Sequence, residues 1–161
     1  MKKVVGYLRI STASQIDNTS IEMQREKIEL YCKLNNIELV NTYVDEGWSA
    51  KDSDRPSYNK MIEFVSNEEN DVDTIIVYKA DRIHRSLKNL MIMVDYLQEI
   101  GIGFISLTEQ FNTNTAQGLL FLQMIGSFSE FERKLISERT HSGRVAKGKK
   151  NLFPGGRIPL G

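Results

Sequence analysis

The chain has 161 residues, 40% of them hydrophobic, and equal numbers of basic and acidic residues, 21 of each. This length suits one domain with a substantial core, and no apolar run approaches the roughly 20 residues that a membrane-spanning helix needs. Cys32 is the only cysteine, which excludes an internal disulfide and a thiolate zinc site, and the N-terminus shows no secretory signal, so a cytoplasmic protein is predicted.

The balanced total charge conceals an uneven distribution along the chain. Residues 1–132 hold 13 Lys and Arg against 20 Asp and Glu, whereas residues 133–161 hold 8 against 1. A basic segment on an acidic body is the electrostatic pattern expected of a protein that binds a polyanion, most often nucleic acid. A solvated basic tail without any partner is the alternative.

The first half of the chain alternates strand-like and helix-like segments. Thr19-x-x-Glu22 is a capping box that opens an amphipathic helix, and Pro56 stands where a second helix favours proline, in its first turn. A polar, turn-rich loop at 45–55 precedes that second helix. The predicted strands are 4–8 and 38–44, and the predicted helices are 19–34 and 56–66.

The second half continues the same alternation. Residues 74–78 are all β-branched or aromatic, which predicts a strand buried on both faces. Apolar residues recur at helical spacing over 86–100, and Gly101 then ends the helix. Residues 102–107 predict a fourth strand.

These repeated strand–helix units predict an α/β fold, a mostly parallel sheet flanked by helices on both faces. The carboxyl ends of parallel strands share one edge of the sheet, where such folds bind ligands. Ser11, Arg55 and the segment 81–85 each follow a predicted strand, so we expect them to lie close together at that edge.

One long helix is predicted from the cap Asn114-x-x-Gln117 to about Lys150, because the next proline is Pro154. Apolar residues spaced by three and four form a seam that fits either a subunit contact or burial against the chain's own sheet. The seam residues are Phe121, Met124, Phe128, Phe131 and Leu135.

Beyond Ile136 this helix has no apolar face, and its charge indicates DNA as the partner. The basic residues predicted to contact DNA are Arg133, Arg139, Arg144, Lys147, Lys149 and Lys150. The predicted organisation is therefore an α/β core at 1–114, the long helix at 115–150 and the start of a linker at 151–161.

Four arginines are expected at the shared sheet edge: Arg9, Arg55, Arg82 and Arg85. Clustered arginines are costly unless an anion offsets them, and a phosphodiester would do so through bidentate contacts that need no metal. Ser11, two residues after Arg9, suits a nucleophile beside a cation, although a Ser-Thr pair after a strand is also common in turns and caps. The carboxylates do not cluster at metal-ligand spacing.

Six motifs, in this order, resemble the catalytic domain of serine recombinases, the resolvase/invertase family. The resemblance covers Val4 to Arg144. The motifs are Tyr7-x-Arg9-x-Ser11-Thr12-x-x-Gln15, Ser20-Ile21-x-x-Gln24, Asp54-Arg55-Pro56, Asp81-Arg82-x-x-Arg85, Phe131-Glu132-Arg133 and Glu138-Arg139-Thr140-x-x-Gly143-Arg144.

By this resemblance, Ser11 forms a phosphoserine link to double-stranded DNA, and two transesterifications cut and rejoin the strands without metal, ATP or other cofactor. A homodimer is implied, with a tetramer at synapsis, in a protein encoded by a bacterium, a phage or a mobile element. The implied phosphate-binding residues are Arg9, Arg55, Arg82 and Arg85; Asp81 assists, and Tyr7, Gln15, Gln24 and Arg133 support the site.

Two features depart from many relatives. Ile83-His84 fills the middle of the Asp81-Arg82-x-x-Arg85 motif, where His84 is either a general base or, more simply, an incidental variant. Residues 155–161 resemble the start of the next domain in large serine recombinases, so the chain is expected to be the catalytic part of a larger integrase or transposase.

Three alternatives to these assignments stay open. Asp81 could form an ordinary ion pair with an arginine and take no part in proton transfer. The whole chain could be a non-catalytic DNA-binding or signalling module on a flavodoxin-like scaffold. A metal-dependent nuclease is the other enzyme that would act on the same substrate.

Overall fold

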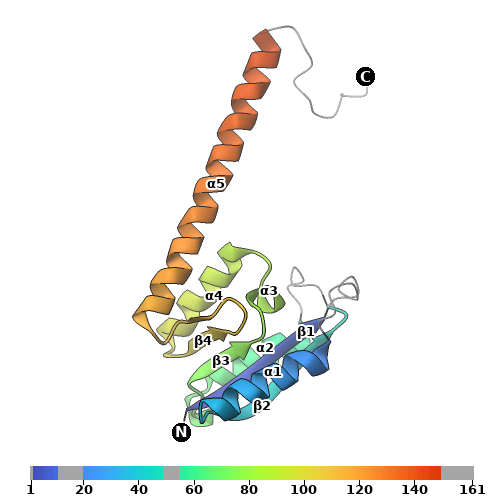
Figure 1. Ribbon diagram of the computed structural model, residues 1–161, viewed down its shortest axis with the longest axis vertical. Helices are drawn as coiled ribbons and strands as arrows, with labels where there is room; N and C mark the ends of the chain where they lie inside the picture. Colours follow the sequence, from blue (N-terminus) through green and yellow to red (C-terminus); the bar gives the residue numbers. More distant parts are fainter. Residues whose placement is uncertain (1, 11–19, 49–54, 150–161) are drawn as a thin grey trace. The chain divides into compact units, whose positions relative to one another are not determined.

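A computed structural model of the chain describes residues 2–10, 20–48 and 55–149, although not the side chains of 129–130, 132–133, 139 and 141–149 (Figure 1). The chain divides into two units, Met1–Gln123 and Met124–Gly161, and each is described by itself. The strands are β1 (Lys3–Ile10), β2 (Glu38–Glu46), β3 (Thr74–Val77), β4 (Gly103–Ser106) and β5 (Phe111–Asn112). The helices are α1 (Ile21–Leu34), α2 (Pro56–Ser66), the 3-10 turn η2 (Glu68–Asn70), α3 (Ala80–Ile83), α4 (Leu87–Glu99) and α5 (Ala116–Lys149).

Within the described residues, five strands form one sheet in the order β2-β1-β3-β4-β5. The first four strands are parallel, and β5 runs antiparallel to β4, with Ser106 paired to Phe111. This topology confirms the predicted α/β fold with a mostly parallel sheet. The edge strand β5 is absent from the sequence prediction because two residues are too few to show alternation.

Adjacent residues of a strand enter different hydrophobic clusters, because successive side chains point to opposite faces of the sheet. Ile75 of β3 packs in the larger cluster, with residues of α2, α4 and the start of α5. Its neighbour Ile76 packs in the smaller cluster with Ile28 and Cys32 of α1. All four residues of β3 are buried, which confirms that helices cover both faces of this central strand.

The first predicted helix starts later than its capping box indicates. Ser20 is the N-cap of α1, and its hydroxyl accepts the N–H of Met23 at 3.1 Å, so the cap is Ser20 and not Thr19. The segment after β3, for which no helix was predicted, contains the single helical turn α3. The second helix matches its predicted bounds, Pro56–Ser66, and Gly101, with φ of 75°, follows the end of α4 as predicted.

The long helix also begins one residue later than its predicted cap. Thr115 Oγ1 accepts the N–H of Gly118 at 3.1 Å, which is the contact expected of an N-cap. Asn114 instead donates its side-chain amide to the Thr74 hydroxyl at 2.9 Å. The start of α5 is therefore fastened to the first residue of β3.

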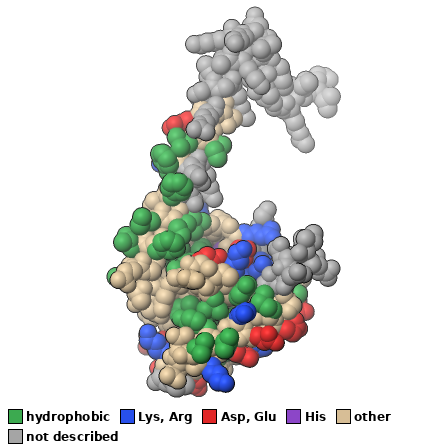
Figure 2. All heavy atoms as spheres, viewed as in Figure 1, with side chains coloured by type: hydrophobic (Ala, Val, Ile, Leu, Met, Phe, Trp, Pro, Cys, Tyr) green, Lys and Arg blue, Asp and Glu red, His purple; other side chains and the backbone are tan. Residues whose placement is uncertain are grey.

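The start of α5 belongs to the core of the first unit, but through different residues from the predicted seam. Leu122 is 1% exposed and lies in the larger cluster, whereas Phe121 is 47% exposed. In the second unit, the seam side chains Met124, Phe128 and Phe131 are all more than half exposed, and hydrophobic side chains are visible at the surface in Figure 2. Among the described residues, none of the helices combines the length and the hydropathy that crossing a membrane requires.

Candidate functional site

Three arginines from separate elements are buried around α3. Arg9 comes from β1, Arg55 from the position just before α2, and Arg82 from α3 itself, with exposed fractions of 1%, 2% and 4%. Charged side chains are almost never buried to this degree unless they are paired. Arg85, two residues beyond the end of α3, is exposed. The predicted cluster of cations at this sheet edge therefore exists for Arg9, Arg55 and Arg82, with Arg85 nearby in the chain.

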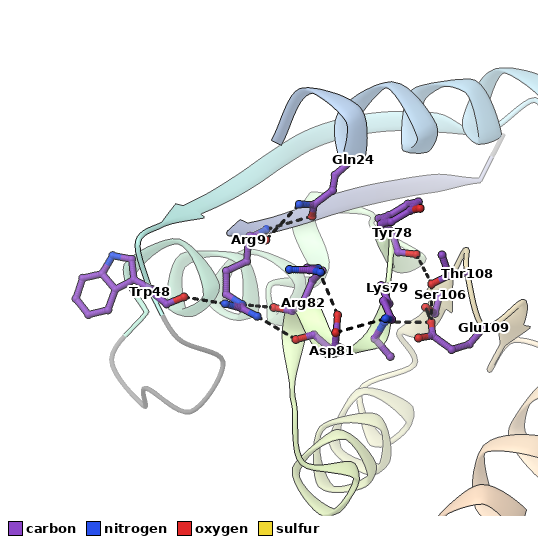
Figure 3. A network of polar contacts seen from close by, with 11 residues as sticks. Arg9, Gln24, Trp48, Tyr78, Lys79, Asp81, Arg82, Ser106, Thr108 and Glu109 are labelled. Atoms are coloured by element: carbon purple, nitrogen blue, oxygen red, sulfur yellow. Dashed lines mark hydrogen bonds and ion pairs between the residues drawn. The ribbon is translucent and has the colours of Figure 1, made fainter. Parts of the chain in front are cut away.

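The Arg9 guanidinium donates to three backbone carbonyls (Figure 3). Its Nε donates to Arg82 at 2.7 Å, its Nη2 to Asp81 at 3.1 Å and its Nη1 to Trp48 at 2.8 Å. Three of the five N–H groups that an arginine carries are thus committed to the protein backbone. Arg9 fastens the end of β1 to α3 and to the segment that follows β2.

Arg55 also binds α3. Its Nη1 donates to the carbonyl of Ile83 at 2.6 Å and to the Tyr7 hydroxyl at 3.2 Å. The guanidinium carbon lies 4.1 Å from the centre of the Tyr58 ring, which is within the range of a cation–π contact. Arg55 is also the N-cap residue of α2, so the position of that helix and of the guanidinium are linked.

Asp45 is a buried carboxylate that connects these parts. It accepts the Tyr7 hydroxyl at 2.9 Å and the backbone N–H groups of Ser57 and Tyr58 at 3.0 Å each. Negative charge at a helix N-terminus is favourable, and here it fixes the start of α2 and therefore Arg55. Asp45 is not among the predicted site residues, because β2 was predicted to end at residue 44, whereas it continues to Glu46.

Asp81 and Arg82 form an ion pair that leaves hydrogen-bonding capacity unused. Asp81 Oδ1 lies 3.3 Å from Arg82 Nε, and Asp81 Oδ2 lies 3.7 Å from Lys79 Nζ. The 3.3 Å contact lacks the geometry of a hydrogen bond. Among the described residues, three buried side-chain atoms of this site have no hydrogen-bond partner: Arg55 Nε, Asp81 Oδ1 and Arg82 Nε.

Gln24, on α1, supports the same edge from the opposite face of the sheet. Its side-chain amide donates to the Arg9 carbonyl at 3.2 Å and accepts the Arg9 N–H at 3.4 Å. The pairing of β1 with β3 ends at Tyr7 and Val77, so this amide satisfies a backbone segment that no longer has β3 beside it. The completely buried Gln24 thereby fixes the backbone that carries Arg9.

His84 contacts Tyr58 and not the ion pair. Its Nε2 lies 3.2 Å from the Tyr58 hydroxyl, and the two rings meet edge to face at 5.5 Å. Burial, with the charge of Arg55 as the smaller cause, lowers the pKa of His84 to about 4. The imidazole is therefore neutral at physiological pH, and it packs edge to face against Tyr58, whose ring contacts Arg55.

The electrostatic environment of the site is positive and partly desolvated. Burial lowers the pKa of Arg9, and the charges of Arg82, Arg55 and Arg85 lower it further, while Tyr7 acts in the opposite direction. Burial also raises the pKa of Tyr7 well above its ordinary value. The Tyr7 hydroxyl consequently stays protonated at neutral pH and can donate to Asp45.

The structure brings together six of the nine residues predicted for catalysis. These are Tyr7, Arg9, Gln24, Arg55, Asp81 and Arg82. Arg85 is exposed, and Ser11 and Gln15 lie outside the described residues, as does Lys150. The side chains of Arg133, Arg139, Arg144, Lys147 and Lys149 are likewise outside the described part. No group of three or more His, Cys, Asp or Glu side chains in the described part could hold a metal ion.

Comparison with known proteins gives one consistent result. Residues 4–152 match the family model described as "Resolvase, N terminal domain". The chain is 35% identical over 157 residues to a DNA-invertase of Enterobacteria phage P7, covering 97% of this chain and 75% of the relative. It is also 35% identical over 156 residues to the serine recombinase gin of Escherichia phage Mu, covering 97% of this chain and 72% of that relative.

Two solved structures are similar over most of the chain. The N-terminal catalytic domain of TP901-1 integrase has a TM-score of 0.72 and 36% identity, and the match covers 83% of this chain and 98% of that one. A resolvase family site-specific recombinase from Streptococcus pneumoniae has a TM-score of 0.70 over 92% of this chain and 99% of that one. At 24% identity, the second similarity shows the fold alone.

Proposed function

The chain belongs to the family of the resolvase N-terminal domain, the catalytic domain of serine recombinases, and on this premise we propose that Ser11 cuts and rejoins DNA through a covalent phosphoserine intermediate. Members of this family bind DNA and act as oligomers. In this proposal, some arginines of the chain bind the scissile phosphate and others hold the residues that do so.

The observation that carries the proposal is the set of unpaired polar atoms around α3. A buried donor without a partner costs about 1–3 kcal/mol, so an evolved site retains one mainly where a ligand pairs with it. Arg55 Nε and Arg82 Nε have no hydrogen-bond partner among the described residues and belong to buried guanidinium groups, and the ion pair of Arg82 with Asp81 does not satisfy its Nε–H. A phosphodiester supplies the negative charge and the acceptor oxygens that both groups need.

The arginines have different roles in this scheme. Arg9 has committed three donors to backbone carbonyls, so it acts chiefly by holding α3 and by its charge. Arg55 and Arg82 keep an Nε donor for the scissile phosphate, and the exposed Arg85 adds a guanidinium that can reach DNA. Such preorganised charge stabilises the phosphorus centre as Ser11 attacks it.

The chemistry is an exchange of one ester for another. The Ser11 oxygen bonds to phosphorus and loses its proton, while the bond from phosphorus to a deoxyribose oxygen breaks and that oxygen takes up a proton. Asp81, which is 40% exposed at its side chain, can orient Arg82 or transfer the proton to the leaving oxygen. Because each step replaces one phosphoester bond by another, the number of such bonds does not change, and the reverse reaction rejoins a strand without ATP.

The exposed seam of α5 gives the subunit contact in this proposal. Phe121, Met124, Phe128 and Phe131 offer large apolar side chains that are 47–62% exposed, and Leu135 extends the same spacing. A second copy of the helix would bury this stripe, which produces a dimer, and two dimers would form the tetramer in which strands are exchanged. The basic part of α5, which precedes the expected linker at 151–161, would then lie along the DNA backbone.

The test is to trap the covalent intermediate on DNA. The protein is incubated with a duplex that carries its recombination site and a nick opposite the cleavage position, so that the cut end diffuses away and the ester cannot be reversed. We expect an adduct that resists denaturation, forms in the presence of a chelator and is absent from Ser11→Ala. An adduct formed by Ser11→Ala, or cleavage that requires a divalent metal, would contradict the proposal.

A further inference from the structure

The single turn α3 carries Asp81 and Arg82, yet it lacks the local features that stabilise a helix. It has four residues, and its N-cap residue Lys79 makes no side-chain capping bond. One helical turn does not persist on its own, because nucleation fixes several dihedral angles for a single hydrogen bond. The position of Asp81 and Arg82 must therefore be set by groups outside α3.

The carbonyl groups of α3 are held by the arginines. Arg9 donates to the carbonyls of Asp81 and Arg82, and Arg55 donates to that of Ile83. These contacts leave the N–H groups at the start of the turn to be satisfied from elsewhere. The orientation of α3 depends on that second attachment as much as on the arginines.

Glu109 provides the second attachment from 29 residues away. Its Oε2 accepts the backbone N–H of Ala80, the first residue of α3, at 3.1 Å. The same oxygen accepts the hydroxyl of Thr108 at 3.1 Å and that of Ser106 in a short contact (Figure 3). The Ala80 N–H and the Ser106 hydroxyl hold this carboxylate oxygen in place, and the Thr108 hydroxyl can contribute a third contact, so the oxygen acts as a fixed cap.

The turn that carries Glu109 is itself anchored to the end of β3. The backbone N–H of Leu107 donates to Val77 at 3.1 Å, and that of Thr108 donates to Tyr78 at 3.0 Å. The Thr108 hydroxyl has a single proton and lies within reach of both the Tyr78 carbonyl, at 3.0 Å, and Glu109 Oε2, so it donates to either of them or is shared between the two. The carboxylate is therefore fixed relative to the strand from which α3 departs.

From these contacts we propose that Glu109 is a positioning residue for the reaction, which caps α3 and so sets Asp81 and Arg82 against the phosphate. The inference rests on the proposed function for its effect on rate. A misplacement of a reacting group by about 1 Å can reduce a rate about a hundredfold. Removing the cap should accordingly slow the formation of the phosphoserine ester more than it weakens DNA binding.

The experiment compares Glu109→Ala and Glu109→Gln with the wild-type protein and with Glu99→Ala, an exposed glutamate at the end of α4. We expect Glu109→Ala to form the covalent adduct about ten- to a hundredfold more slowly under single-turnover conditions, with DNA affinity changed less than about twofold. Glu109→Gln keeps the volume and one acceptor oxygen, so it should recover part of the rate. Glu99→Ala should match the wild type.

A readout independent of activity is the backbone N–H of Ala80. Its proton resonance should lie downfield in the wild type, since a carboxylate is a strong acceptor, and it should move upfield and exchange faster in Glu109→Ala. A wild-type cleavage rate in folded Glu109→Ala, or an unchanged Ala80 resonance, would overturn the proposal. A wild-type protein that forms no adduct would contradict the proposed function instead, and the Ala80 resonance would still decide whether Glu109 holds α3.

Discussion

The edge of the sheet around α3 and the exposed face of α5 differ in how far the chain itself satisfies their side chains. At the sheet edge, Arg9 and Arg55 are buried and held by backbone carbonyls supplied by the same chain. On α5, Met124 and Phe128 are 61% and 62% exposed and have no comparable cover. Under the proposed function, the first region is a phosphate-binding surface that one chain preorganises, and the second is a contact surface that a second copy would complete. The proposed function therefore predicts that changes in the two regions have separable effects, on the rate of the reaction and on assembly.

The largest effect is expected at the nucleophile. Ser11→Ala should abolish the covalent adduct and all strand exchange, because no other group in this scheme can form the ester. The change removes one oxygen atom, so the free energy of unfolding should shift by no more than roughly 0.5 kcal/mol. Adduct formation on nicked duplexes and thermal unfolding of both proteins measure the two effects. If the alanine variant were inactive because it is unfolded, the result would contradict the predicted separation of activity from stability.

The next effect concerns the geometry of the cations. Arg82→Lys should lower the rate of adduct formation by about 10²–10³, because an ammonium lacks the planar fork that spans two phosphate oxygens. Arg85→Lys should also fail to restore full activity, with a milder effect on folding because Arg85 is exposed. Near-normal rates from both variants would mean that the arginines supply only a diffuse positive field. Lys88→Arg, on exposed α4 surface, serves as the matched control.

A third change addresses the contact surface alone. Phe128→Glu should shift the protein toward monomer, because an unpaired carboxylate buried in an apolar interface costs several kcal/mol. Sedimentation velocity over a range of concentrations would show the shift, and thermal unfolding should change little because Phe128 is exposed within its own subunit. An unchanged oligomeric state in this variant would show that the seam is not the subunit contact. Ser127→Glu, on an adjacent exposed position, tests whether charge on the helix is sufficient.

A smaller effect is expected for binding by the basic part of α5. Phosphate contacts position a protein without reading bases, so this chain alone should bind cognate and scrambled duplexes with similar affinity. The logarithm of the affinity should fall with the logarithm of salt concentration, with a slope of about −0.9 for each phosphate neutralised. Binding titrations with both duplexes at several salt concentrations measure this slope. A preference for the cognate sequence that persists as salt rises would reveal a base-reading element within the chain.

The smallest effect concerns His84. Its pKa in the folded protein, about 4, lies below the ordinary 6.5, so the unfolded chain binds the proton more tightly. Its contribution to stability should be complete above pH 6.5 and decline as the pH falls toward 4. His84→Gln should therefore lose less stability than the wild type over that interval. An imidazole resonance that titrates near pH 7 would instead restore His84 as a candidate general base.

The sequence predicts the sheet edge better than it predicts the contacts made there. Arg9, Arg55 and Arg82 could be assigned to one edge because each follows or ends a strand of a parallel sheet. Asp45 was hidden by the polar composition of its neighbours, although β2 continues through it. Glu109 and Tyr58 act through tertiary contacts to α3 and Arg55, and no local pattern records such contacts. The start of the long helix was predicted to within a residue, since helical spacing is a local property.

The most direct test of the account is the structure of the trapped covalent complex between the protein and DNA. We predict that the phosphate esterified to Ser11 lies at about 3 Å from both Arg55 Nε and Arg82 Nε, the two buried guanidinium donors that have no hydrogen-bond partner among the described residues. Arg9 should keep its three contacts with backbone carbonyls in that complex. A phosphate bound away from α3, with both Nε donors still unpaired, would contradict the account.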